Sequence, residues 1–144
     1  MGTRRESREL ALQALYQLEV TGEGDSARGL ALFWTHFEAE PDARSFAREL
    51  VDGVREHRER IDALISSSAE HWRLPRLSRV DLNLLRLATF ELLARPDIPA
   101  SVTINEAIEI ARRFGSDDSA AFVNGVLDHI AAVLGVKEKL GGAG

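Results

Sequence analysis

The segment VDLNLLRLATFELL, residues 80–93, constrains the fold more than any other part of the chain. Its apolar side chains occupy nearly every side of a helix, and they are Val80, Leu82, Leu84, Leu85, Leu87, Ala88, Phe90, Leu92 and Leu93. A helix that is hydrophobic on all sides is normally enclosed by other helices. The segment therefore predicts the buried centre of a helical bundle. Ser78 and Asp81 mark its start, because they form an S-x-x-D variant of the capping box.

The remaining segments also show helical periodicity, and no stretch alternates in the manner of a strand. The four prolines lie between the periodic segments, where they end or separate helices. Besides the central helix, the pattern predicts helices over residues 4–20, 26–37, 42–71 with a break near His57, 103–114 and 116–134. The prediction is a single all-α domain of six or seven helices within 144 residues.

Local signals predict where the last two helices begin and end. Thr103 and Glu106 form a T-x-x-E capping box, which places a helix start at Thr103. Gly115 is a good helix stop, and Ser116 is the predicted cap of the last helix.

The linker WRLPRL, residues 72–77, divides the predicted helices into two packed halves. Because Pro75 interrupts a helix, the divide is expected near it, with halves at 1–74 and 75–136. Residues 137–144 are predicted to form a flexible tail.

Composition excludes several classes of protein. The chain has no cysteine, which excludes disulfides and thiolate sites and suits a reducing cytoplasm, the predicted location. No apolar run approaches the roughly 20 residues that a membrane span requires, so no membrane association is expected. The net charge of −5 argues against a nucleic-acid binder that acts alone.

The sequence contains none of the usual constellations of an enzyme. The four histidines do not form an H-x-x-x-H pair, and no phosphate-binding glycine loop or G-x-S-x-G elbow occurs. Asp128 and His129 are adjacent, but neighbours in a helix do not face each other. The chain is therefore predicted to be no enzyme and to bind no metal or cofactor.

Four residues of the last two predicted helices allow two interpretations each. Gly125 favours close helix packing over the approach of a partner, and Asn124 favours an internal hydrogen bond over a ligand contact. Phe114 and Phe122 flank the turn after Gly115. They are either core aromatics or a shelf on which unstacked bases rest.

The first helix begins with a small basic cluster. Arg4, Arg5 and Arg8 against Glu6 leave a local charge of +2 in the first eight residues. Cations are unfavourable at a helix N-terminus, which hints that these arginines serve something outside the helix. The alternative is an ordinary solvated helix start. Arginines in an N-terminal arm suit phosphate contacts and base stacking, so any RNA is expected at this local patch.

Several segments together resemble the NusB family of bacterial transcription antitermination factors. They are RESRELALQALYQ, LSRVDLNLLRLATFEL, DIP, VTINEAIEIARRFG, DDS and FVNGVLD, which follow the order and spacing of the family. Each motif is weak by itself, but together they extend along most of the chain. The resemblance implies the all-α NusB-like fold of two helical subdomains.

The resemblance also implies a function. NusB-like proteins bind a small-subunit ribosomal protein of the NusE type (S10), and the pair recognises single-stranded boxA RNA in nascent ribosomal transcripts. This assembly nucleates a complex with RNA polymerase and other Nus factors, so that transcription continues through terminators. A basic partner would complement the acidic net charge of this chain.

The family's functional residues can be carried over by position. The residues implied to contact RNA are Arg4, Arg5, Arg8, Asp118, Ser119 and Phe122. Those implied to bind the partner are Tyr16 and Asp81, and for Asp81 the capping role is at least as well supported. The basic arm of the family is often denser, whereas Glu6 and Ser7 interrupt it here.

Two alternative functions stay open, and so does the question of whether the protein forms a homodimer. The chain is either an RNA-binding antitermination factor or an adaptor that binds the ribosomal partner and scarcely touches RNA. A third alternative is the accessory domain of a ribosomal RNA cytosine methyltransferase, which would require a larger protein than 144 residues. A homodimer that masks the RNA-binding surface is also open.

Overall fold

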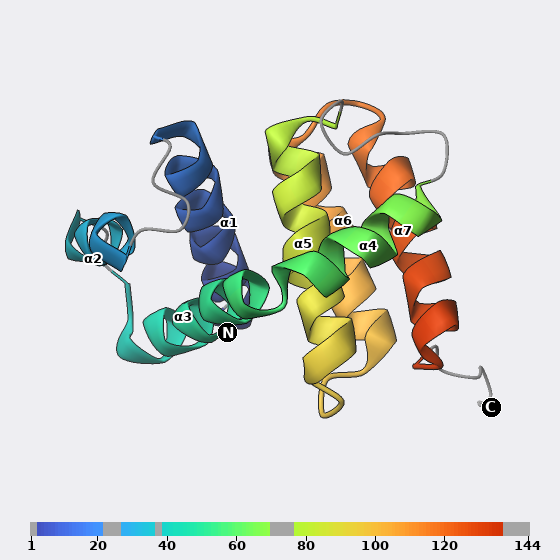
Figure 1. Ribbon diagram of the computed structural model, residues 1–144, viewed down its shortest axis with the longest axis horizontal. Coiled ribbons are helices and arrows are strands. Elements are labelled where there is room, and N and C mark those ends of the chain that lie inside the picture. Colours follow the sequence, from blue (N-terminus) through green and yellow to red (C-terminus); the bar gives the residue numbers. More distant parts are fainter. Residues whose placement is uncertain (1–2, 22–26, 37–38, 70–76, 137–144) are drawn as a thin grey trace.

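The computed structural model describes residues 3–21, 27–36, 39–69 and 77–136. Within these ranges the chain forms seven α-helices and no strand (Figure 1). The helices are α1 (Thr3–Thr21), α2 (Ala27–His36), α3 (Pro41–Glu56), α4 (Arg58–Ser68), α5 (Arg79–Ala94), α6 (Ala100–Phe114) and α7 (Ser119–Leu134). The predicted all-α class is confirmed. Most of the predicted linker and all of the predicted tail lie outside the described residues.

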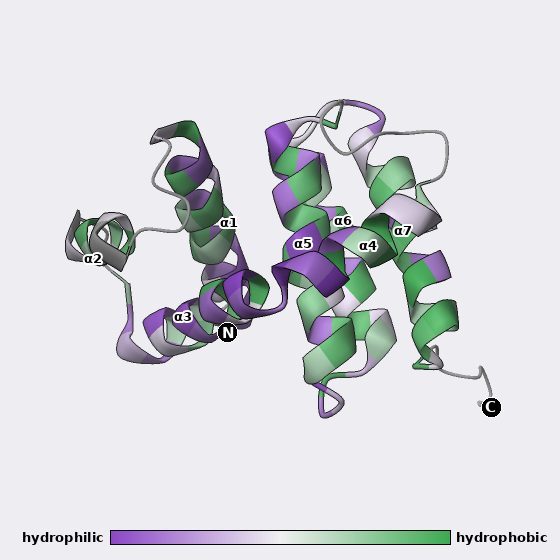
Figure 2. Cartoon of the chain, viewed as in Figure 1, coloured by the Kyte–Doolittle hydropathy of each residue, from purple (hydrophilic) through white to green (hydrophobic). Residues whose placement is uncertain are grey.

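Helix α5 is the buried centre that its composition predicts. Every residue from Leu82 to Leu92 is buried, and the helix contacts α1, α3, α4, α6 and α7. Figure 2 shows hydrophobic residues on α5 and its neighbours α6 and α7, and many hydrophilic residues along α3. Burial of apolar surface from five helices against one element explains why a helix with so little polar surface is stable.

Polar side chains of α5 tie it to the surrounding helices. The Asn83 side-chain amide donates to Glu19 on α1 at 2.8 Å. Arg86 is buried and donates to both carboxylate oxygens of Asp62 on α4, at 2.9 and 3.1 Å. These bonds satisfy polar groups that would be costly to bury unpaired, and they fix the register of α5 against α1 and α4.

The helices group into α1–α3 on one side and α4–α7 on the other, with α5 in contact with both groups (Figure 1). Helix α1 packs on α3 and α5, whereas α4 packs on α5 and α7. The division into halves at Pro75 stays a prediction. Helix α4 precedes Pro75 in the chain, yet its packing places it with the carboxyl-terminal helices.

The predicted break near His57 is confirmed, and the structure gives its surroundings. His57 separates α3 from α4, and its ring stacks on Phe90 with centroids 6.1 Å apart. One turn earlier, a methyl group at Gly53 would overlap the Phe90 ring. The absence of a side chain at Gly53 therefore lets α3 approach α5 closely.

The cap predicted for the central helix is confirmed in part. The Asp81 backbone N–H donates to the Ser78 hydroxyl at 3.0 Å, so Ser78 caps α5. Among the described residues, the Asp81 carboxylate does not return a bond to Ser78, and its Oδ1 atom is buried without a hydrogen-bond partner.

The capping box predicted at Thr103 and Glu106 is wrong. Helix α6 begins three residues earlier, at Ala100, with Pro99 in the N-cap position. Proline has a backbone φ suited to a helix start and no N–H to leave unsatisfied, so the chain turns directly into the helix. Thr103 and Glu106 lie inside α6 and bond to other helices.

The predicted stop at Gly115 is confirmed, but the cap predicted at Ser116 is wrong. Helix α7 begins at Ser119, with Asp118 in the N-cap position. A cap at Ser116 would place its hydroxyl as the acceptor of a backbone N–H of α7. Instead, the Ser116 backbone N–H donates to the Ser119 hydroxyl at 2.9 Å.

Gly125 and Asn124 are both exposed on α7, which corrects the close packing favoured for Gly125 and the internal hydrogen bond favoured for Asn124. A methyl group at Gly125 would meet no atom within 4 Å. Asn124 is in the interior of α7, and its side chain is not seen to bond to another helix among the described residues. The approach of a partner at Gly125 remains untested.

Candidate nucleic-acid interface

The three predicted RNA-binding arginines lie in the opening turns of α1, because the helix already begins at Thr3. Their side chains differ in exposure. Arg4 and Arg5 are exposed, whereas Arg8 is buried with 5% relative exposure. The expectation of a solvated basic helix start is therefore wrong for Arg8.

Arg8 forms a buried ion pair with α5. Its Nε and Nη2 atoms donate to the two carboxylate oxygens of Glu91, both at 2.7 Å. The Thr103 hydroxyl of α6 donates to the same carboxylate at 3.0 Å. This network joins α1, α5 and α6, and it explains the burial of an arginine near a helix N-terminus, since the opposite charge offsets the helix dipole.

Arg5 forms a second two-bond pair, in this case with Glu106 of α6. Its Nε and Nη2 atoms donate to the Glu106 carboxylate at 2.7 and 2.8 Å. The hydrogen bonds from Arg5, with added attraction from Arg5 and Arg8, hold the pKa of Glu106 below its usual range against the effect of burial. The carboxylate is therefore ionised at neutral pH.

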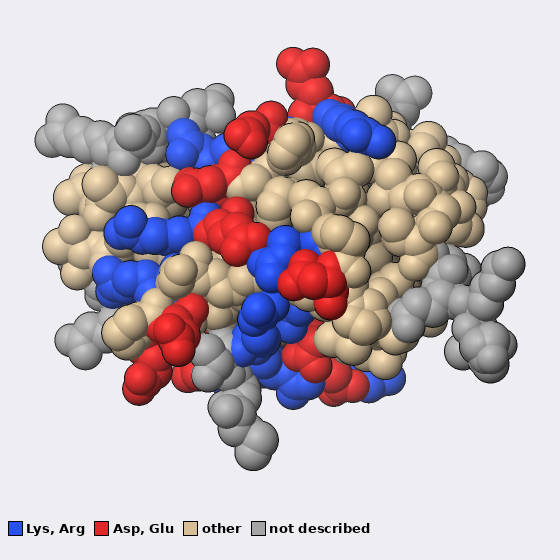
Figure 3. All heavy atoms as spheres, turned by 90° about the horizontal axis from the view of Figure 1, so that it is seen from below, with Lys and Arg blue, Asp and Glu red and all other residues tan. Residues whose placement is uncertain are grey.

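Arg4 lies over a ring instead of a carboxylate. Its guanidinium carbon is 4.1 Å from the centroid of Phe46 on α3, and Arg95 reaches the same ring at 5.2 Å. Arg95 also donates to Asp97 and Glu49, and its hydrogen bond is the main cause that lowers the pKa of Asp97. Figure 3, the view from below, shows acidic and basic side chains interleaved in a band across one face of the molecule.

The turn between α6 and α7 holds the second predicted group. Asp118 is exposed, and its side chain makes no cap bond to α7. Ser119 is buried, where its hydroxyl accepts from Ser116, so it closes the turn. A side chain at Gly115 would overlap Ser119, which explains the glycine at this position.

The two phenylalanines that flank this turn differ. Phe122 is partly buried and packs against the core, as the core interpretation expects. Phe114 is 43% exposed, and the guanidinium carbon of Arg113 lies 5.1 Å from its ring centroid. The core interpretation is therefore wrong for Phe114, whose ring is available for stacking.

Helix α6 links the two predicted RNA-binding groups. Midway along α6, Glu106 bonds to Arg5, and near the end of the helix Arg113 bonds to Glu9 of α1 at 3.0 and 3.2 Å. The α6–α7 turn follows directly after Phe114. The structure therefore brings the exposed arginines of α1 and the aromatic end of α6 onto one connected surface.

Three residues that connect to the predicted arginines or to the exposed ring were not expected from the sequence: Glu91, which is buried, and Glu106 and Arg113, which are not. The signal for Arg113 is the pair of arginines before Phe114, which places strong charge beside an aromatic residue. Glu91 is a carboxylate within an otherwise apolar helix, which indicates a buried partner. No local signal identifies Glu106, because its partner is 101 positions away.

The predicted partner-binding residues lie where the later part of α1 meets the start of α5. Tyr16 is 42% exposed, and one turn further Val20 is 55% exposed. Asp81 is partly buried at the start of α5. Glu19 connects the two regions, since it accepts from Asn83 and lies 3.5 Å from Arg79.

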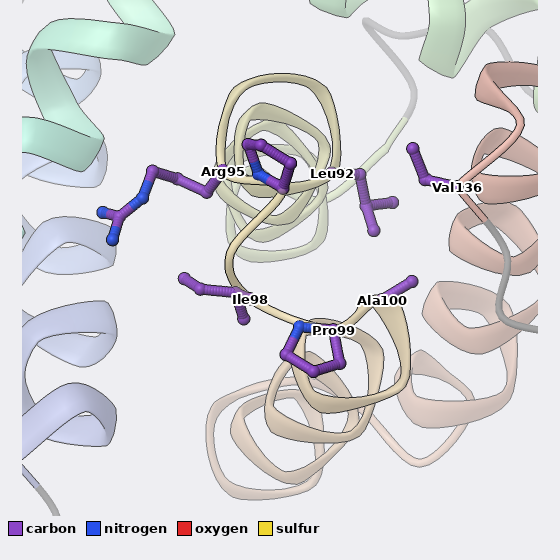
Figure 4. Close-up of a pocket in the computed structure, with 7 residues that line it drawn as sticks. Leu92, Arg95, Ile98, Pro99, Ala100 and Val136 are labelled. Atoms are coloured by element: carbon purple, nitrogen blue, oxygen red, sulfur yellow. The ribbon is translucent and has the colours of Figure 1, made fainter.

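A pocket of about 340 Å³ lies at the turn between α5 and α6. Its lining is mainly apolar and includes Leu92, Ile98, Pro99 and Val136. In Figure 4 the Arg95 side chain points away from this lining. Among the described residues that line it, no convergent set of polar groups faces the pocket.

Among the described residues, no three histidine, cysteine or acidic side chains come together in a way that would hold a metal ion. Within the same ranges, no helix combines the length and the apolar character that crossing a membrane requires.

The fold and this surface define the class: an all-helical protein whose exposed arginines and aromatic ring are of the kinds that contact the phosphates and bases of a nucleic acid. The model of the NusB family matches residues 5–132. The chain is 53% identical over 138 residues to transcription antitermination protein NusB of Myxococcus xanthus (strain DK1622), covering 93% of this chain and 98% of that protein. It is also 53% identical to the protein of that name from Geobacter sulfurreducens, covering 93% and 97%. The chain therefore belongs to the NusB family.

Solved structures agree with this assignment. NusB of T. maritima superposes with a TM-score of 0.80 at 45% identity, covering 90% of each chain. A chain from the crystal structure of antitermination factors NusB and NusE in complex with dsRNA gives a TM-score of 0.78 at 27% identity, covering 92% of this chain and 98% of that one. The NusB-like fold expected from the sequence is confirmed.

Proposed function

We propose that this protein pairs with a NusE-type ribosomal protein (S10), recognises boxA RNA in nascent ribosomal transcripts and promotes processive transcription. The observation that carries the proposal is the likeness to a chain from a complex of NusB, NusE and RNA, at a TM-score of 0.78. The family assignment supports the same role. Assembly with RNA polymerase and other Nus factors belongs to the proposal, which assigns the protein no enzymatic step.

The proposed RNA site runs from the start of α1 to the turn after α6. Arg4 and Arg5 are exposed and supply the phosphate contacts. Asp118 lies beyond the other end of α6, where its carboxylate can accept from a base edge. The exposed Phe114 ring at that end can support a base, whereas Phe122 is partly buried against the core and its predicted contact with RNA stays untested. Ser119 shapes this turn from within, because its side chain is buried.

Arg8 belongs to the proposed site by a different role. Its burial and its two bonds to Glu91 leave little surface for a phosphate. We assign it the positioning of the α1 start against α5 and α6, so that Arg4 and Arg5 face the RNA. Its predicted direct contact with RNA stays untested.

The proposed surface for the NusE-type partner contains Tyr16 and Asp81. Tyr16 offers a large, rigid side chain that is 42% exposed, a type that is frequent at the centre of interfaces. Asp81 has a buried Oδ1 atom without a hydrogen-bond partner, so a donor from the partner could satisfy it after a small shift. The RNA in the related crystal structure is double-stranded, and the single-stranded boxA target is our proposal.

The test is a fluorescence titration of a boxA-type RNA and a scrambled RNA, with and without the NusE-type partner, at two salt concentrations. We expect tight binding that prefers boxA, improves with the partner and weakens with salt. Arg4→Ala and Arg5→Ala should each weaken RNA binding while partner binding is retained. Arg60→Ala is the matched control. Arg60 is exposed on α4, so this substitution removes the same charge at a distance from the proposed site.

A second candidate is an adaptor that binds the partner and scarcely touches RNA. The observation in its favour is that carboxylates already neutralise Arg5, Arg8 and Arg113. In the same titration the adaptor would bind the partner, yet boxA affinity would not exceed that of the scrambled RNA. Sedimentation of the protein without partner or RNA would detect a homodimer that hides the proposed RNA site.

A further inference from the structure

The pair between Arg5 and Glu106 occupies the atoms that a phosphate would use. Two parallel N–H groups of the guanidinium, on Nε and Nη2, point at the two Glu106 oxygens at 2.7 and 2.8 Å. This fork is also the geometry in which arginine binds a phosphate. The Arg5 side chain is 45% exposed and that of Glu106 is 21% exposed, so an approaching RNA can reach the pair.

Glu106 is held in place by the rest of the network. The Arg8 Nη1 atom lies 4.0 Å from Glu106 Oε1, on the buried side of the carboxylate. Arg8 is itself fixed by its two bonds to Glu91. If Arg5 leaves, Glu106 keeps a positive neighbour, so separation of the pair does not strand an isolated carboxylate.

We propose that Glu106 is an internal counter-anion for Arg5, and that RNA phosphate must displace it to bind. Glu106 thereby limits RNA affinity and its dependence on salt. This inference rests on the proposed function, since it concerns the same RNA site. Chemically, one oxyanion exchanges for another on the guanidinium, and no covalent bond changes.

The expected effect follows from charge. A guanidinium that already carries a carboxylate gathers little additional counter-anion, and it must lose that carboxylate before it binds phosphate. Replacing Glu106 with glutamine keeps the shape but removes the negative charge. We expect RNA affinity to rise by roughly two- to fivefold, the effect of a partly exposed ion pair. The slope of log affinity against log salt should steepen by up to about 0.7, the value for one phosphate contact on a single strand.

The experiment compares the wild type with Glu106→Gln, Arg5→Ala and the double variant, using boxA-type and scrambled RNA with the NusE-type partner. Glu109→Gln is the matched control. Glu109 lies one turn further on α6 and accepts from Arg112 at 2.6 Å. Glu109→Gln therefore removes the same charge while the two bonds between Arg5 and Glu106 stay in place. We expect a gain with Glu106→Gln, a clearly smaller change with Glu109→Gln, and no gain from Glu106→Gln when Arg5 is alanine.

Several results would overturn the inference. Equal gains in the two glutamine variants would mean that only net charge matters. A loss of affinity in Glu106→Gln would mean that Glu106 orients Arg5 for RNA, and a gain that persists without Arg5 would place its origin elsewhere. If Glu106→Gln does not fold by circular dichroism, Glu106→Asp replaces it, because the shorter carboxylate keeps the charge and weakens the two-bond pair. A smaller gain is then expected, and no gain would count against the inference.

The failure of the proposed function has a different signature. If the wild type with its partner binds boxA no better than scrambled RNA, the RNA-binding role falls and this inference falls with it. If boxA binding is strong and Glu106→Gln leaves it unchanged, only the role of Glu106 is wrong.

Discussion

Arg5 and Arg8 lie in the opening turns of α1, at the end where the helix dipole disfavours cations. Glu106 and Glu91 reach them from α6 and α5 and offset that cost. The sequence identified the arginines and their unfavourable position. It could not distinguish Arg5 from Arg8, because exposure depends on helices that lie more than 80 positions away in the chain.

Removing Arg8 should damage the fold more than the surface. Arg8→Met leaves the Glu91 carboxylate buried with only the Thr103 hydroxyl as a donor from the present network. We expect a loss of about 3–5 kcal/mol in the free energy of unfolding, measured by urea denaturation. Arg8→Met combined with Glu91→Gln should recover a large part, because no charge is then buried. A single variant as stable as the wild type would contradict a structural role for Arg8.

The pair between Arg5 and Glu106 should stabilise the protein in a pH-dependent way. The pKa of Glu106 is lowered in the folded state from an ordinary value of 4.5, so the pair contributes fully above that pH. The contribution is lost as the pH falls through the lowered pKa of the folded protein. The difference in unfolding free energy between wild type and Glu106→Gln should therefore be constant near neutral pH and shrink in acid. A difference that grows on acidification would contradict this sign.

At the scale of single helices, periodicity predicted six or seven helices with a break near His57, and the described residues form seven. Helix ends were predicted less accurately, because a capping pattern can also occur inside a helix. The T-x-x-E pattern of Thr103 and Glu106 lies inside α6, where both side chains bond to distant partners instead of the backbone. Pro99 offered a competing start, and the structure uses it.

Two helical glycines should respond in opposite ways to alanine. Gly53→Ala places a methyl group against the Phe90 ring and should cost about 1–3 kcal/mol of stability, the usual effect of overpacking. Gly125→Ala meets open space within α7 and should add about 0.5–1 kcal/mol, because glycine is a poor helix former. Thermal and urea unfolding of both variants would check the pair, and each serves as the other's control. Destabilisation by Gly125→Ala would contradict the open space around Gly125.

At the scale of the whole molecule, one apolar segment determines the architecture. Because α5 contacts helices of both groups, the two groups share a core instead of forming separate ones. This followed from the sequence, since only an enclosed helix tolerates so few polar positions. The position of α4 beside α7 did not follow, because side-chain pattern alone does not say which neighbour an amphipathic helix covers.

A shared core predicts that the two groups unfold together. Leu85 is fully buried in α5, so Leu85→Ala should cost about 2–5 kcal/mol. Hydrogen exchange followed by mass spectrometry should show equal losses of protection in the slowest amides of α1 and α7, although these helices belong to different groups. Exposed Val133 of α7 supplies the control, since Val133→Ala removes little buried surface and should leave both helices protected. If α7 loses protection while α1 keeps it, the helices around α1 form an independent unit, and the contact with α5 only docks one unit onto the other.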